Sequence, residues 1–138
     1  MQIEKDDTLG KARTVLLKNS NGIAKVESFE DLFGLVHHLL SPISGVGELY
    51  IYDTTLRIGV KMGFLPQKVY LHAGTRFGAK NLGPDYNGVS LEVASVPREF
   101  QELSAHEIED VLCIYKEHLN RATRTVRSSD AVGRSWCN

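Results

Sequence analysis

The strongest constraint on the fold is a run of apolar side chains that has helical spacing and ends at a proline. Ser28 precedes the run, and its hydroxyl can accept a hydrogen bond from the amide of Asp31, as helix starts require. Apolar residues three and four positions apart share one helix face, so the run predicts an amphipathic helix. The run consists of Phe29, Leu32, Phe33, Val36 and Leu40. Pro42 disfavours helical backbone at the residue before it, so we expect this helix to end by Leu40.

A second helix is predicted shortly after that proline. The linking residues are Ile43–Gly47, and residues 48–59 again carry apolar side chains at helical spacing. Glycine accepts backbone angles that other residues avoid, so Gly45 and Gly47 permit a tight turn. We expect Val46 to insert between the two helices. The free amides at the start of the second helix, at the positive end of its dipole, suit a phosphate oxygen.

This order of helix, glycine turn and helix resembles the helix-hairpin-helix motif of the DNA glycosylase superfamily. The resemblance covers residues 28–83, with the turn at Ile43–Gly47 and a Gly-x-x-Pro step at Gly63–Pro66. Val69–His72 falls where that family often has Val-Asp-Thr-His. The resemblance implies a helical fold in which the hairpin contacts the DNA backbone, and such contacts read no base sequence.

The departures from the family concern its chemistry. Tyr70 occupies the position of the family's catalytic aspartate, and a phenol cannot replace a carboxylate at neutral pH. The bifunctional members have a lysine nucleophile just after the hairpin, where this chain has residues 48–50, Glu-Leu-Tyr. The cysteine cluster of the iron–sulfur members is missing as well. The resemblance therefore implies a DNA-binding hairpin without glycosylase activity.

The rest of the chain adds further helices and little β-structure. A helix is expected from about Leu9 to Lys18, broken by Asn19–Gly22, and the pattern Ser104–Glu107 is typical of a capping box that opens a last helix. The segments 69–71 and 89–93 are β-prone, although residues 69–71 could instead lead into a helix. The sequence thus predicts a mainly α fold with one or two short strands. We expect one helical domain over residues 1–120 and a poorly ordered tail, rich in arginine and serine, over 121–138.

Charge is distributed unevenly along the chain, although the net charge is only −1. No acidic residue occurs between Asp53 and Asp85. The cations of that interval are Arg57, Lys61, Lys68, Arg76 and Lys80. Uneven charge is common in proteins, but an acid-free basic stretch also suits a polyanion such as DNA. We therefore add Arg57, Lys61, Arg76 and Lys80 to the hairpin as candidate DNA-binding residues.

A second candidate site lies in residues 69–80. Gly74 would allow close backbone approach to an anion, Thr75 offers a hydroxyl donor, and Arg76 offers a two-pronged cation. The bland interpretation is that Gly74 and Gly78 simply allow two helices to pack tightly.

The same segment supplies candidates for catalysis. His72 is suited to act as an acid or base near neutral pH. Tyr52 and Asp53 would join His72 if the preceding helix packs alongside it. The alternative is a purely structural role, in which His72 is a half-buried, hydrogen-bonded histidine.

The two cysteines and the polar N-terminus indicate a compartment. Cys113 lies in an apolar run and is expected to be a core residue, whereas Cys137 is the penultimate residue. A disulfide is therefore not expected, and a reducing, cytoplasmic location is predicted. No Cys or His spacing typical of metal sites occurs, so no metal or cofactor is predicted. No apolar run is long enough to span a membrane, and the N-terminus is too polar for a signal peptide.

Three functions remain open. A DNA-backbone-binding protein should bind duplexes without sequence specificity, and added salt should weaken that binding. An interaction protein of the inhibitor or immunity type should use the basic face on a partner protein and bind no DNA. A small enzyme should bring His72, Arg76, Tyr52 and Asp53 together in a concave site.

Overall fold

The computed structural model describes residues 7–83 and 86–119. These residues form a mainly α protein with one small sheet, which confirms the predicted fold class. The chain divides into two compact units, Met1–Leu65 and Pro66–Asn138, and each is described by itself. The single domain expected over residues 1–120 stays a prediction. The expected tail, 121–138, lies outside the described residues.

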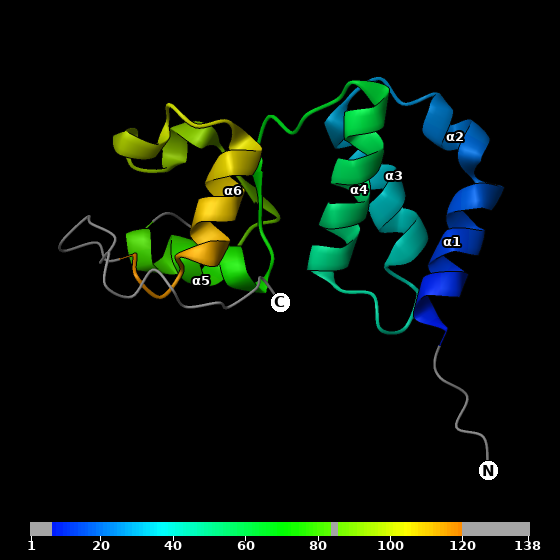
Figure 1. Ribbon diagram of the computed structural model, residues 1–138, viewed down its shortest axis with the longest axis horizontal. Helices are drawn as coiled ribbons and strands as arrows, with labels where there is room; N and C mark the ends of the chain where they lie inside the picture. The colour runs from blue at the N-terminus through cyan, green and yellow to red at the C-terminus, as the bar shows by residue number, and fades with distance from the viewer. Residues whose placement is uncertain (1–6, 84–85, 120–138) are drawn as a thin grey trace, which may run out of the picture. The chain divides into compact units, whose positions relative to one another are not determined.

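The described residues of the first unit are mainly helical (Figure 1). Their helices are α1 (Thr8–Lys18), α2 (Ser20–Ala24), α3 (Phe29–Leu40) and α4 (Glu48–Met62). The helices α3 and α4 lie side by side, and α1 packs against α3. The buried side chains of this core come from three helices and are Ala12, Leu32, Val36, Leu40 and Ile51.

Local sequence explains where α3 begins and ends. The Ser28 hydroxyl accepts a hydrogen bond from the Asp31 amide at 3.0 Å, as predicted from the capping pattern. The helix ends at Leu40, also as predicted. Ser41 nevertheless keeps helical backbone angles, φ −59° and ψ −30°, so Pro42 does not force it into extended backbone.

Two other helix boundaries differ from the expectation. Asn19 does end α1, and its side-chain amide donates to the Val15 carbonyl at 2.8 Å. The helix is thus broken after Lys18, as expected, but residues 20–22 are not a turn, because the short helix α2 begins at Ser20. The helix α4 continues to Met62, three residues beyond the expected end, and stops at Gly63, whose φ is +82°. That left-handed conformation costs glycine little, and it commonly ends helices.

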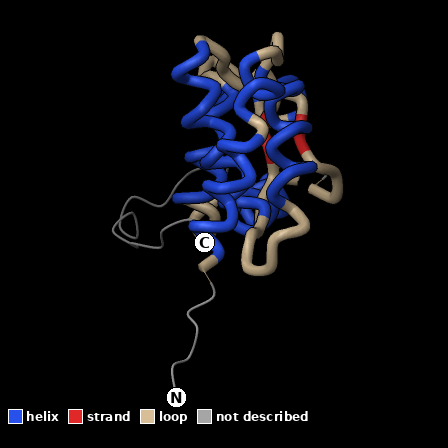
Figure 2. The backbone as a smooth tube through the Cα atoms, turned by 90° about the vertical axis from the view of Figure 1, so that its right-hand side faces the viewer, coloured by secondary structure: helices blue, strands red, loops and turns tan. Residues whose placement is uncertain are grey.

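The second unit combines two helices with a small sheet. Its elements are β1 (Val69–Tyr70), α5 (Ala73–Leu82), β2 (Ser90–Leu91), the 3₁₀ helices η1 (Val93–Ser95) and η2 (Arg98–Phe100), and α6 (Ala105–Ile114). The two strands are antiparallel, with Val69 opposite Leu91. Figure 2 shows them in red, side by side. Of residues 69–71, which the sequence left ambiguous, Val69 and Tyr70 form a strand, and α5 begins two residues after Leu71.

Close approach of α5 to α6 organises the core of the second unit. A Cβ atom built on Gly78 would lie 2.1 Å from the carbonyl oxygen of Leu112, so the two backbones meet with no side chain between them. This confirms that a glycine here serves tight helix packing. Around this contact lie the buried apolar side chains Val69, Leu71, Ala79, Leu82, Leu91, Val96, Ala105, Ile108, Leu112 and Leu119.

No helix within residues 7–83 or 86–119 is both long enough and apolar enough to span a bilayer.

Candidate functional site

A short turn joins α3 to α4 at the position where the sequence predicts a hairpin, and this turn is called the hairpin below. Gly45 has φ +86°, in the left-handed region that favours glycine. The turn is closed by the Ile43 amide, which donates to the Leu40 carbonyl at 3.0 Å, and by the Val46 amide, which donates to the Ile43 carbonyl at 3.2 Å. Val46 is partly buried and packs against the core of the first unit. The turn therefore has the geometry expected of it, with Val46 pointing inward.

The first turn of α1 lies against this hairpin. The Thr8 hydroxyl donates to the Ser44 carbonyl at 3.2 Å, and a Cβ atom on Gly45 would lie 3.0 Å from the Thr8 Oγ1. This contact was not predicted from the sequence. Its two partners lie 36 positions apart and neither has an unusual residue type, so no local pattern could have revealed it.

The start of α4 is open to solvent. Gly47 is the N-cap residue, has extended backbone with φ −106° and ψ 179°, and caps the helix with no side chain. No atom lies within 4 Å of a Cβ built on Gly47, so a side chain at this position would meet open space. The first amides of any helix lack intrahelical acceptors, and here the N-cap residue gives them no side-chain hydrogen bond. One exposed acid, Glu48, lies in this first turn.

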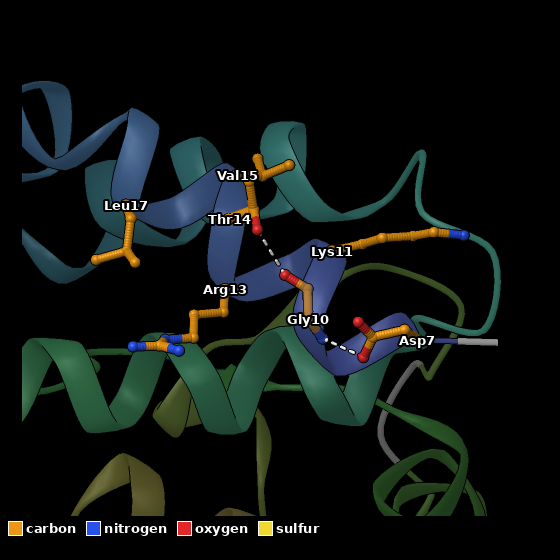
Figure 3. A pocket seen from close by; sticks show the side chains of 7 residues that line it. All are labelled: Asp7, Gly10, Lys11, Arg13, Thr14, Val15 and Leu17. Carbon is orange, nitrogen blue, oxygen red and sulfur yellow. Dashed lines mark hydrogen bonds between the residues drawn. The ribbon is translucent and has the colours of Figure 1, made fainter. Parts of the chain in front are cut away.

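Two cationic side chains of α1, in the first unit, point in different directions (Figure 3). Lys11 and Arg13 line a pocket together with Asp7, Gly10, Thr14, Val15 and Leu17. In Figure 3 the Lys11 side chain extends toward the end of α1 at which Asp7 lies, and Arg13 points the opposite way. Thr8, one turn before Lys11, contacts the hairpin, so Lys11 is the cation of α1 best placed near the turn.

The four basic residues predicted to bind DNA are divided between the two units. Arg57 and Lys61 are exposed on α4, four positions apart. At 1.5 Å per residue they lie about 15 Å and about 21 Å along the helix from Gly47, so they are remote from the start of α4. Arg76 and Lys80 lie on α5 of the second unit.

The residues proposed for an anion site hold the second unit together. The Thr75 hydroxyl accepts from the His72 amide at 2.6 Å and donates to the His72 carbonyl at 3.0 Å. Gly74 and Thr75 are buried. The Arg76 guanidinium donates to the carbonyls of Tyr86 and Gly88, both at 2.7 Å. An anion at this position would have to compete with each of these internal bonds.

His72 is more deeply buried than the sequence suggested. Its side chain is 1% exposed, and its Nε2 lies 2.5 Å from Oε1 of Glu109, which is 7% exposed. Glu109 was not among the predicted site residues, because its partner is 37 positions away. Tyr52 is buried and Asp53 exposed on α4, in the first unit, so their union with His72 stays a prediction.

Cys113 completes the surroundings of this buried pair. It is fully buried, as its apolar neighbours in the sequence predict. The expectation that it forms no disulfide is wrong, because Cys113 is disulfide-bonded. An apolar run indicates burial but carries no information about covalent pairing. Cys137, the other cysteine of the sequence, lies outside the described residues.

The chain was also compared with known proteins. Neither the comparison with models of protein families nor the searches of curated proteins and solved structures give a match. Functional conclusions for this chain therefore rest on its own geometry and charge.

Proposed function

We propose that this protein binds the DNA backbone without sequence specificity through the hairpin between α3 and α4. The observation that carries the proposal is the start of α4, where the N-cap Gly47 makes no side-chain hydrogen bond to the first-turn amides and a Cβ built on it would meet open space. Amides at a helix N-terminus, at the positive end of the helix dipole, bind phosphate oxygens. The left-handed Gly45 and the inward Val46 shape the turn that presents them. No glycosylase chemistry is part of the proposal.

The charged side chains around the hairpin are of both signs, so we expect DNA binding to be weak. Lys11 adds a cation near the turn, whereas Asp7 and Glu48 place exposed carboxylates at the two adjoining helix starts. The chain as a whole has a net charge of −1. We therefore expect few phosphate contacts, and each contact should contribute about −0.9 to the slope of log K against log salt.

The test compares two glycine variants in a salt titration with short duplex and single-stranded DNA. Gly47→Glu places a carboxylate in front of the open amides. Gly34→Glu adds the same charge on the exposed side of α3, where a built Cβ likewise has no atom within 4 Å. We expect Gly47→Glu to weaken binding by up to about fivefold, because a charge at a helix end contributes up to about 1 kcal/mol. Gly34→Glu should change affinity less than twofold.

Two outcomes would count against this function, and a third would change the variant used. No binding of the wild-type protein at low salt would overturn it, and attention would move to a partner protein or to a ligand near His72 and Arg76. Equal losses in the two variants would show that net charge, and not the hairpin, controls binding. Loss of the circular dichroism signal in Gly47→Glu would shift the test to Lys11→Gln, which leaves the hairpin backbone intact.

A further inference from the structure

The buried pair of the second unit has a third potential ligand beside it. One ring nitrogen of His72, a carboxylate oxygen of Glu109 and the Sγ of Cys113 all lie within 4.8 Å of one another. His72 is the N-cap residue of α5, and the other two residues are one turn apart on α6. The close packing at Gly78 brings these two helices together. The fold thus gathers three different metal-binding side chains in its core.

Apolar packing does not explain why His72 and Glu109 are buried in this core. A buried imidazole and a buried carboxylate both cost free energy unless their polar atoms are satisfied. The Nε2 of His72 is satisfied by Glu109, but its buried Nδ1 has no hydrogen-bond partner in the described part of the chain. The His72 ring takes the capping-box position over the start of α5, yet it makes no hydrogen bond of normal geometry there. His72 therefore has binding capacity that the fold does not use.

We propose that His72, Glu109 and Cys113 bind one Zn²⁺ ion when the disulfide at Cys113 is reduced. Imidazole, carboxylate and thiolate are the three side-chain groups that zinc takes in proteins. Three protein ligands leave the fourth tetrahedral position for a water molecule. Zinc bonds of about 2.0–2.3 Å place neighbouring ligand atoms about 3.6 Å apart. The donors therefore need to shift by about 1 Å.

The redox state of Cys113 controls this site. The sulfur of a disulfide has no thiolate charge, so it does not ligate zinc. A water-soluble phosphine reduces the bond by supplying two electrons, while water supplies the two thiol protons and the oxygen of the phosphine oxide. Zinc then displaces the Cys113 thiol proton to solvent. The imidazole stays neutral, with its single proton on the nitrogen that does not bind the metal.

Cobalt(II) is the probe of choice, because a thiolate ligand gives it a near-ultraviolet charge-transfer band. We expect the reduced wild-type chain to bind one Co²⁺, with this band and the visible bands of a tetrahedral ion. Zn²⁺ should displace the cobalt and abolish both sets of bands. The unreduced wild-type chain should show neither. Zn²⁺ should also raise the Tm of the reduced chain and leave that of the unreduced chain unchanged, which tests the site without any substitution.

Variants separate this site from adventitious binding at surface histidines such as His37 and His38. Cys113→Ser should abolish the charge-transfer band, and Glu109→Gln should weaken Co²⁺ binding about tenfold or more. Cys137→Ser removes the other cysteine of the sequence, so it should bind Co²⁺ with the full band and without phosphine. Circular dichroism checks that each variant is folded.

Three results would overturn the proposal that zinc binds at His72, Glu109 and Cys113. It would be overturned by a reduced wild-type chain that shows no charge-transfer band at equimolar Co²⁺. Equally strong Co²⁺ binding by folded Cys113→Ser would also overturn it, since the metal would then lie elsewhere. A Tm that rises with Zn²⁺ by the same amount in both redox states would exclude Cys113 as the controlling ligand.

Discussion

At position 78 the main chain of α6 leaves no room for a side chain. A methyl group there would lie 2.1 Å from the Leu112 carbonyl oxygen, and backbone atoms cannot move aside as a flexible side chain does. Gly34, in the middle of α3, has no atom within 4 Å of the same built position. These two helical glycines therefore have opposite reasons to be glycine.

We predict opposite effects of alanine at these two positions. Gly78→Ala should lower the free energy of unfolding by about 3 kcal/mol or more, because it forces two packed backbones apart. Gly34→Ala should raise it by about 0.5–1 kcal/mol, because alanine favours the helix. Urea unfolding followed by circular dichroism measures both. Similar destabilisation by the two substitutions would contradict the close α5–α6 contact.

Glu107 at the start of α6 gives a prediction about pH. The Ser104 amide donates to Oε2 of Glu107 at 2.8 Å and the Ser104 hydroxyl donates to the same oxygen at 2.7 Å. These bonds, the backbone one first, lower the pKa of Glu107 below its ordinary value. A carboxyl group whose pKa is lowered by folding stabilises the fold above its unfolded pKa. That contribution is lost as the pH falls through the lowered pKa.

Substitution of this carboxylate should therefore flatten part of the acid dependence. We expect Glu107→Gln to lose less stability than the wild type between neutral and acidic pH, because glutamine keeps a neutral cap at all pH values. Tm measured across this range tests the point. Glu102→Gln, an exposed change outside the capping box, is the control. Parallel curves for wild type and Glu107→Gln would show that the capping box does not couple to pH.

At the scale of single elements, the hairpin combines an open helix start with an unfavourable charge. Glu48 lies in the first turn of α4, where its carboxylate stabilises the helix but repels a phosphate. We predict that Glu48→Gln strengthens DNA binding about two- to fivefold at low salt, from roughly 0.3–1 kcal/mol of relieved repulsion. Fluorescence anisotropy with a labelled duplex measures the change.

Glu27→Gln is the matched control for that experiment. Glu27 is exposed and precedes α3, at the end of the helix remote from the hairpin. An α-helix rises 1.5 Å per residue, so the twelve residues of α3 separate Glu27 from the turn by about 18 Å. An equal gain in both variants would indicate a general charge effect and would remove Glu48 from the interface.

Local signals predicted the elements whose causes are local. The Ser28 cap, the end of α3 at Leu40 and the glycine turn each depend on residues within four positions, and the structure has all three. The capping box at Ser104 was predicted for the same reason. The helix α2 was missed, because the residues after Asn19 favour turns and the helix there is only five residues long.

Long-range contacts account for the remaining differences. The sequence could not pair His72 with Glu109 across 37 positions, nor Thr8 with Ser44 across 36, because neither pair leaves a periodic pattern. The burial of His72 likewise depends on its packing against α6, which is distant from it in the sequence. The candidate hairpin was thus predictable in outline, whereas its support by α1 and the buried metal-binding group were not.

At the scale of the whole molecule, each unit has a core of its own. Leu32 is fully buried in the first core and Ile108 in the second. Truncation of either side chain to alanine should cost about 2–5 kcal/mol. We predict that Leu32→Ala raises amide hydrogen exchange mainly in residues 7–65, and Ile108→Ala mainly in the second unit. Equal loss of protection throughout, from either variant, would instead support the single domain expected over residues 1–120.

The contact between Thr8 and Ser44 also has a consequence for the order of folding during synthesis. A ribosome adds about 5–20 residues per second, so Ser44 emerges about 2–7 s after Thr8. The segment of α1 has only eleven residues, and an isolated helix of that length is marginal in water. The contact that holds its first turn forms only when α3 and the glycine turn have followed it. During synthesis, the start of the chain therefore waits several seconds for the partner against which it packs.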